Sequence, residues 1–310
     1  MNTNIKHKEM AKGLLSLLPF CLFAFLLFTV TACSDDDPDK ESVITIDKVD
    51  YNAFDRWLRA NYVNTYNIEF KYRFETNEAD HNFYLIPAEY RQSIELAHII
   101  KYTCLEAFDE AVGVDFTNAN FPKQLVLIGN FEYHNNGTFT LGTAEGGKKI
   151  YFLGVNDLDS HKNSIAELNR YYLKTIYHEF THILNQTVEY AADYKLITAN
   201  GYVADSWSDA PYNANYLERG FISSYSQKEV DEDFAEMFSI YVTNTAAQWD
   251  AWMQEAGTDG SAYLEAKLNS VRNYMYESWG IDMDKLREIV LRREADVVNG
   301  RVDLTSLEVE

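Results

Sequence analysis

Two histidines and a glutamate within a few positions are the residues of this chain best suited to catalysis. They are His178, Glu179 and His182, in "YHEFTHILNQ" at residues 177–186. Four residues turn an α-helix by about 400°, so both histidines project from one face and can reach one Zn²⁺ at about 2.0–2.1 Å. Glu179 lies about 100° further round, where its carboxylate can take a proton from a water whose pKa zinc lowers. The spacing therefore predicts a zinc hydrolase centre with Glu179 as general base.

A chance pair of core histidines is the alternative. The chain has 7 histidines in 310 residues, so a random H-E-x-x-H is expected in about one such chain in a hundred. The flanking residues also favour a metal site. Ile176, Phe180 and Ile183 give the motif apolar neighbours, as a helix through the middle of a metallopeptidase requires.

The third ligand of the zinc must come from further along the chain, since a catalytic zinc takes three protein ligands and a water. The metzincin spacing would place glycine and histidine where this chain has Asn185 and Val188. The stretch "EVDEDFAEMFSIYV" carries Glu232 and Glu236 four apart on a predicted helix. One would bind zinc and the other could accept the N–H of a ligating histidine. A solvated acidic face is the alternative for this helix. Three aspartates are weaker candidates for the ligand: Asp193, Asp205 and Asp209.

"HEFTH" followed by "SYSQKEVDEDFAEMF" resembles the zinc domain of the anthrax lethal factor family. The whole chain also resembles a family of Bacteroidetes lipoproteins described as zinc metallopeptidases associated with SusD-type substrate import. The resemblance implies a zincin-like fold and a glutamate-type (gluzincin) site, with Glu232 as third ligand and Glu236 as its outer partner. Tyr225, seven residues before the ligand glutamate, would then hydrogen-bond the oxyanion. The chain departs from the lethal factor pattern at Thr181, in place of glycine, and at Asp233, in place of phenylalanine.

The first 32 residues read as a secretory signal: three lysines, an apolar run of about 20 residues, and "VTAC" at its end. A retained membrane helix is the alternative. The junction resembles a bacterial lipobox, which implies cleavage before Cys33 and lipid attachment to it. Residues 33–44 form an acidic tether. Its "CSDDD" start resembles the surface-export signal of Bacteroidetes lipoproteins, which implies the outer face of the outer membrane, with a periplasm-facing protein as the alternative.

Composition indicates a folded protein that does not bind nucleic acid. Hydrophobic residues make up 46% of the chain and charged residues 24%. The net charge of −21 leaves no surplus of cations to neutralise phosphates. Once Cys21 leaves with the signal and Cys33 is lipidated, Cys104 stands alone, so no disulfide framework is expected.

Periodicity predicts an α+β fold in which helices surround a small mixed sheet. We expect a catalytic domain over 45–310, with an α/β lobe to about 186 and a helical lobe over 187–310. Helices are predicted over these stretches: 50–66, 88–113, 164–186, 229–244 and two more up to about 297. Strands are predicted over 67–74, 123–130, 137–144 and 148–156, the last two joined as a hairpin by "EGG".

The sequence also suggests how a substrate is held. The run "KKIYFLG", residues 148–154, is expected at the edge of the sheet, where it could pair with an extended substrate backbone. Trp207 would line the cleft or anchor a loop, whereas His134 and His161 are expected outside the metal site.

We therefore expect a surface-anchored metallo-endopeptidase with one Zn²⁺ per chain. Its partners would be a peptide or protein substrate, the membrane through the lipid at Cys33, and import proteins of the SusC/SusD type. The main alternative is a component of such an import complex that keeps zinc but turns over weakly, binding a glycan or peptide. A structural lipoprotein with incidental histidines is the other.

Overall fold

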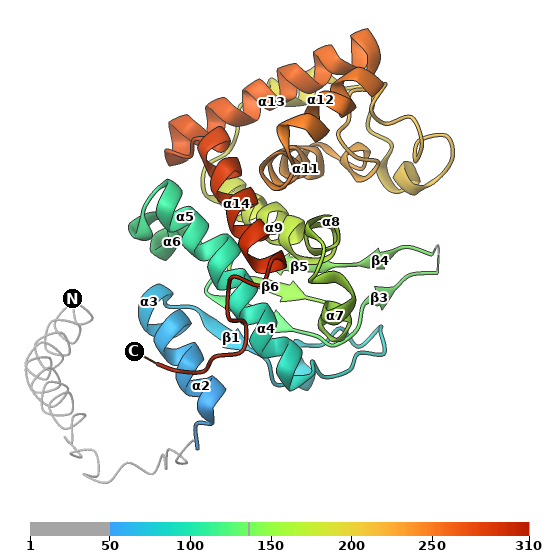
Figure 1. Cartoon of the computed structure of the whole chain (residues 1–310). Coiled ribbons are helices and arrows are strands. Elements are labelled where there is room, and N and C mark those ends of the chain that lie inside the picture. Colours follow the sequence, from blue (N-terminus) through green and yellow to red (C-terminus); the bar gives the residue numbers. More distant parts are fainter. Residues whose placement is uncertain (1–49, 136, 310) are drawn as a thin grey trace, which may run out of the picture. The chain divides into compact units, whose positions relative to one another are not determined.

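A four-stranded sheet lies at the centre of the computed structural model, which describes residues 50–135 and 137–309 (Figure 1). Its strand order is β1 (Glu69–Lys71), β2 (Gln124–Leu127), β6 (Lys149–Phe152), β5 (Gly142–Glu145). The first three strands are parallel, and β5 is antiparallel to β6. The predicted signal (1–32) and tether (33–44) lie outside the described residues. The α+β prediction and the "EGG" hairpin are confirmed.

Alternate residues of the strands point to opposite faces of the sheet, and each face packs into a different hydrophobic core. One face packs into the main core beneath the helices through Leu125, Leu127, Ile150 and Phe152. The other face carries a smaller apolar cluster of Val126, Ile128, Phe131 and Leu153. The helices are therefore concentrated on one face of the sheet.

Three long helices occur where periodicity predicts them, and each contains a π-helical turn. The first consists of α2 (Ala53–Leu58), η1 (Arg59–Val63) and α3 (Asn64–Tyr66). The second consists of α4 (Tyr90–Ile100), η3 (Lys101–Leu105) and α5 (Glu106–Ala111). The third consists of α8 (Ile165–Leu168), η5 (Asn169–Leu173) and α9 (Lys174–Thr187), and α9 carries the H-E-x-x-H motif.

The other long helices lie towards the C-terminus: α11 (Val230–Thr243), α12 (Ala246–Glu255), α13 (Gly257–Trp279) and α14 (Met283–Val298). Three of them follow residue 244, where two were predicted. The break falls at Gly257, whose φ of +67° few other residues adopt. The short helices are α6 (Val114–Asn120), α7 (Leu158–His161), α10 (Tyr194–Ile197) and the 3₁₀ turns η2 (Thr76–Glu78), η4 (Val155–Asp157), η6 (Ala204–Ser208) and η7 (Tyr225–Gln227). Among the described residues, none of these helices is long and apolar enough to span a membrane.

The predicted edge strand is wrong. Residues 148–154 contain β6, which lies between β2 and β5, so the edge strands of this sheet are β5 and β1. The predicted strand over 137–144 is also two strands: β4 (Phe139–Thr140) pairs with β3 (Glu132–Tyr133), and β5 pairs with β6. The hairpin was visible in the sequence, but the parallel pairing of β6 with β2, which makes β6 interior, joins segments with no local signal.

Gly142, the first residue of β5, allows this edge strand to lie against α9. A Cβ atom here would lie 2.5 Å from the carbonyl oxygen of Tyr151 and 2.6 Å from Cγ2 of Thr175 on α9. Leu141 accepts a hydrogen bond from the Leu153 amide (3.1 Å). Since antiparallel partners alternate, the N–H and C=O of Gly142 point away from β6, towards the open edge.

Helix α11 packs against α9, α13 and α14 and is buried along most of its length. Its two glutamates are included: Glu232 is 9% exposed and Glu236 1%. The solvated acidic face weighed for this helix is therefore wrong. Cys104 is buried in the core.

Asp233, the departure from the lethal factor pattern, makes a fully buried ion pair. Its Oδ2 lies 2.7 Å from Nζ of Lys267 on α13, and both side chains are 0% exposed. The Tyr202 hydroxyl donates to the same carboxylate (3.0 Å), and Lys267 donates to the carbonyl of Gly220 (2.7 Å). The pair thus joins α11 and α13 to the irregular segment 188–228.

Lys267→Met should destabilise the protein by about 3–5 kcal/mol, because it leaves the Asp233 charge buried without a partner. Urea unfolding measures the loss. Removing both charges in Lys267→Met/Asp233→Asn should recover a large part of it. The exposed Lys195→Met is the control and should stay within about 0.5 kcal/mol of wild type. A loss below about 1 kcal/mol for Lys267→Met would contradict this role.

Candidate metal centre

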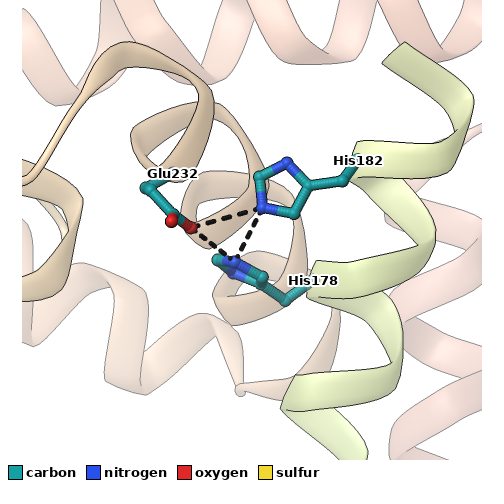
Figure 2. A group of neighbouring side chains, drawn as sticks. All are labelled: His178, His182 and Glu232. Carbon is teal, nitrogen blue, oxygen red and sulfur yellow. Dashed lines mark hydrogen bonds and ion pairs between the residues drawn. The ribbon is translucent and has the colours of Figure 1, made fainter. Parts of the chain in front are cut away.

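The side chains of His178, His182 and Glu232 converge on one point between α9 and α11 (Figure 2). The two Nε2 atoms lie 3.0 Å apart. Oε2 of Glu232 lies 2.9 Å from Nε2 of His178 and 3.3 Å from Nε2 of His182. Within the described part of the chain, no other group of histidine, cysteine and carboxylate side chains is arranged for a metal.

These distances and this donor set fit a zinc ion. Two ligand atoms at about 2.0–2.1 Å from a tetrahedral zinc lie about 3.3 Å apart. Nδ1 of His178 faces a carboxylate oxygen at 2.9 Å, so a neutral His178 carries its proton there and presents a lone pair at Nε2. Lone pairs of a histidine and a carboxylate then face one another, an arrangement that a cation stabilises.

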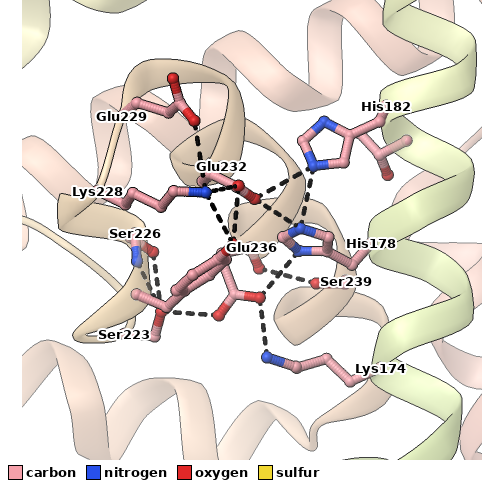
Figure 3. A network of polar contacts seen from close by, with 12 residues as sticks. Lys174, His178, His182, Ser223, Ser226, Lys228, Glu229, Glu232, Glu236 and Ser239 are labelled. Carbon is pink, nitrogen blue, oxygen red and sulfur yellow. Dashed lines mark hydrogen bonds and ion pairs between the residues drawn. The ribbon is translucent and has the colours of Figure 1, made fainter. Parts of the chain in front are cut away.

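Glu236, one turn after Glu232, is the carboxylate that faces Nδ1 of His178 (Figure 3). Its Oε1 also accepts from Nζ of Lys174 (2.8 Å), and its Oε2 accepts from the hydroxyl of Ser223 (2.7 Å). Burial raises the pKa of Glu236, but Lys174 and His178 outweigh it and hold the pKa well below its usual value. An ionised Glu236 therefore fixes the orientation of the His178 ring.

Glu232 divides its two oxygens between different partners. Oε2 faces the histidines, whereas Oε1 accepts from the Tyr225 hydroxyl (2.8 Å) and from Nζ of Lys228 (2.7 Å). Burial opposes ionisation of Glu232, yet its histidine and lysine partners hold its pKa well below the usual value. In the metal-free protein, burial lowers the pKa of His178, but Glu232 and Glu236 together raise it to about 9.

A cavity of about 330 Å³ opens beside the cluster. Glu179 lines it together with His178 and Tyr225. Trp207 also lines it and packs edge-on against Tyr225, with ring centroids 5.0 Å apart. The remaining lining residues come from the β3–β4 turn, β4, β5, the start of α9 and α11: His134, Thr138, Phe139, Thr140, Leu141, Gly142, Lys174, Thr175 and Glu236. The prediction that Trp207 lines the cleft is therefore confirmed, and its contact with Tyr225 anchors the loop as well.

The structure brings His178, His182, Glu232 and Glu236 together on the two helices predicted to carry them, with Glu179 and Tyr225 beside them. Tyr225 lies on the turn η7, for which no element was predicted. Asp193, Asp205 and Asp209 do not belong to the cluster. His134 lines the far wall of the cavity, where its Nε2 lies 2.8 Å from the Thr140 hydroxyl, and His161 stacks on Tyr171 away from the cluster.

Sequence analysis missed the two lysines and Ser223. In the sequence, Lys174 precedes His178 by four residues and Lys228 precedes Glu232 by four. Residues at this spacing share one face of a helix, so Lys174, which begins α9, could be placed beside His178. Lys228 precedes α11 and is separated from it by the extended Glu229, so its contact with Glu232 depends on the turn and not on helical spacing. Ser223 lies in the irregular segment and had no such signal.

An α+β fold whose buried helix carries two histidines opposite a glutamate is the arrangement of zincin-like metallopeptidases. Residues 47–284 match the family described as "putative zinc-binding metallo-peptidase", and the chain belongs to this family. A crystal structure described as a "putative zinc-binding metallo-peptidase" from Bacteroides caccae is 39% identical in sequence, with a TM-score of 0.72. The match covers 86% of this chain and 100% of that one. No curated protein matches the chain.

Replacing either kind of ligand should abolish metal binding. The full chain should hold about one zinc per molecule, and His178→Ala and Glu232→Ala should each reduce this sharply, because two protein ligands bind zinc much more weakly than three. Metal content after dialysis, measured by mass spectrometry, gives the result. His161→Ala is the matched control and should keep its zinc. Zinc retained in Glu232→Ala would show that the third ligand is another residue.

Proposed function

We propose that the protein is a zinc-dependent metallo-endopeptidase of the gluzincin type, anchored at the cell surface. The observation that carries the proposal is the cluster of His178, His182 and Glu232, which opens to a cavity lined by Glu179. Zinc, when bound, lowers the pKa of water and polarises the carbonyl of the scissile bond. The residues around the cluster supply proton transfer, charge stabilisation and substrate alignment.

Glu179 is the general base in this proposal. It follows His178 on α9, so the helix turns its carboxylate to the cavity side of the ligand pair. There it accepts a proton from the attacking water and later delivers it to the leaving amine. A site kept only for binding has no need of this carboxylate, which is why its presence favours hydrolysis.

Tyr225 is the donor to the oxyanion. Burial and the neighbouring Glu232 raise the pKa of its phenol, so it keeps its proton at neutral pH. Its hydroxyl donates to Oε1 of Glu232, at the margin of the cavity. Turning from this carboxylate to a developing oxyanion would let the same proton stabilise the transition state.

An extended peptide fits the open edge of β5. Gly142 directs its N–H and C=O away from β6 and lines the cavity, so a substrate backbone could pair with it as an added strand. Among the described residues, no other strand occupies this edge. Phe139, Leu141 and Trp207 add apolar wall on either side, which suits a peptide side chain more than a charged ligand.

The alternative function for the same site is that of a weakly active component of an import complex. It shares the zinc ligands and the cleft, and differs only in whether bound peptide or glycan is turned over. Partnership with SusC/SusD-type import proteins is part of either proposal and rests on the family resemblance.

Glu179→Gln should separate the two readings, because it removes the base and leaves the ligands. Hydrolysis of a quenched fluorescent peptide library should fall by at least about 100-fold, with the zinc content unchanged. Glu189→Gln, an exposed change just beyond α9, is the control. A wild-type chain that binds peptides or glycans with zinc in place but cleaves nothing would favour the import component.

Cys33→Ser should release the protein from membranes, since the proposed lipid anchor needs the thiol. In detergent phase separation, wild type should enter the detergent phase and the variant the aqueous phase. Protease added to intact cells should degrade the wild-type protein at the surface. Protection from the protease would place it in the periplasm, and equal partitioning of both proteins would contradict the lipid anchor.

A further inference from the structure

Lys228 is a charged residue of the site to which the proposed mechanism gives no role. Its Nζ lies 2.7 Å from Oε1 of Glu232 (Figure 3). It also lies 3.2 Å from the hydroxyl oxygen of Tyr225. The same nitrogen lies 5.2 Å from the centre of the Tyr225 ring. Lys228 thus contacts both the proposed third ligand and the proposed oxyanion donor.

The position of Lys228 follows from the turn that starts α11. Tyr225 begins the 3₁₀ turn η7, and the Lys228 amide closes it by donating to the Tyr225 carbonyl (3.0 Å). Glu229 is extended and occupies the position before the first residue of α11, so Glu232 falls in the first helical turn. The short stretch from 225 to 232 therefore carries the phenol, the ammonium group and the carboxylate on one side.

The contact differs from an ordinary surface pair, which contributes little. The side chains of Glu232 and Lys228 are only 11% and 30% exposed. Three carboxylates lie close to His178, those of Glu179, Glu232 and Glu236. Lys174 pairs with Glu236, and Lys228 pairs with Glu232.

A metal site of defined geometry requires that the two oxygens of Glu232 have different partners. A carboxylate can bind a metal through one oxygen or both, and hydrogen bonds from outside the site select between these modes. Here Oε2 faces the histidines and Oε1 is held by two donors. One of those donors, Tyr225, must leave Glu232 to reach a substrate in the proposed mechanism. Oε1 then depends on the donor that stays.

We propose that Lys228 is a positioning residue that holds Oε1 of Glu232 away from the metal, so that Glu232 binds through Oε2 alone whether or not Tyr225 is engaged. The inference rests on the proposed metal site but not on peptide hydrolysis. It makes Tyr225 free to exchange partners, because Lys228 keeps the ligand in place during the exchange.

Cobalt in place of zinc tests this, since its visible bands weaken as the number of ligand atoms rises from four to five. The full chain should give strong bands. Lys228→Met should weaken them, because Tyr225 alone holds Oε1 and a part of the molecules then gains Oε1 as a fifth ligand atom. Tyr225→Phe should keep the wild-type spectrum, and the double variant should lose more intensity than Lys228→Met alone. Circular dichroism checks that each variant is folded.

Two controls separate charge from general disturbance. Lys228→Arg keeps a cationic donor and should restore most of the intensity. Glu229→Gln changes the other carboxylate near Lys228, at 3.6 Å and largely exposed, and should have no effect.

An unchanged spectrum in Lys228→Met would overturn the inference. So would a Tyr225→Phe spectrum as weak as that of Lys228→Met, since Tyr225 would then be the residue that holds Glu232. A wild-type chain that binds no metal would overturn the proposed function and this inference together. A chain with the expected spectra but no peptidase activity would overturn the proposed function alone.

Discussion

The packing of α9 against α11 is the contact on which the rest of the structure depends. It brings atoms of residues 50 and 54 positions apart in sequence to within 3.3 Å of one another. Removing charged side chains from water costs several kcal/mol for each ion, so Glu232 and Glu236 can be buried here only because cations and imidazoles meet them. A shift of one turn would separate each carboxylate from its partner, which ties the ligand geometry to the register of the two helices.

Much of the cavity wall beside this helix pair comes from elements that contribute no side chain to the metal cluster. Gly142 lets the edge strand approach α9, and that approach gives the cavity a wall of open backbone. On the opposite side, the irregular segment that carries Trp207 and Tyr225 is tied to α11 and α13 by the buried pair of Asp233 and Lys267. The segment that lines this side of the cavity is thus attached to α11, the helix that carries Glu232.

Local patterns predicted the helices, the hairpin and the residues of the metal cluster, because their signals lie within one element. The four-residue spacing in α9 and again in α11 was enough to select the ligands, although the choice of Glu232 over Glu236 came from a family resemblance. The order of the strands in the sheet could not be predicted from the sequence, because the pairing of β2 with β6 joins distant segments. The helix break at Gly257 could have been predicted, because glycine is a local signal. The ion pair of Asp233 with Lys267 could not, because it depends on how α11 and α13 pack.

The charge compensation of the centre has a consequence for protein design. Each of the two facing segments contains its own cation: Lys174 lies one turn before His178 on α9, and Lys228 lies in the turn that precedes α11 and Glu232. The metal site is thus a nearly self-sufficient module of two peptides, 174–182 and 225–236, to which Ser223 adds one hydrogen bond. Grafted onto another pair of crossing helices, these peptides would transfer ligands, orienting groups and counter-charges together, with only the cleft left to build.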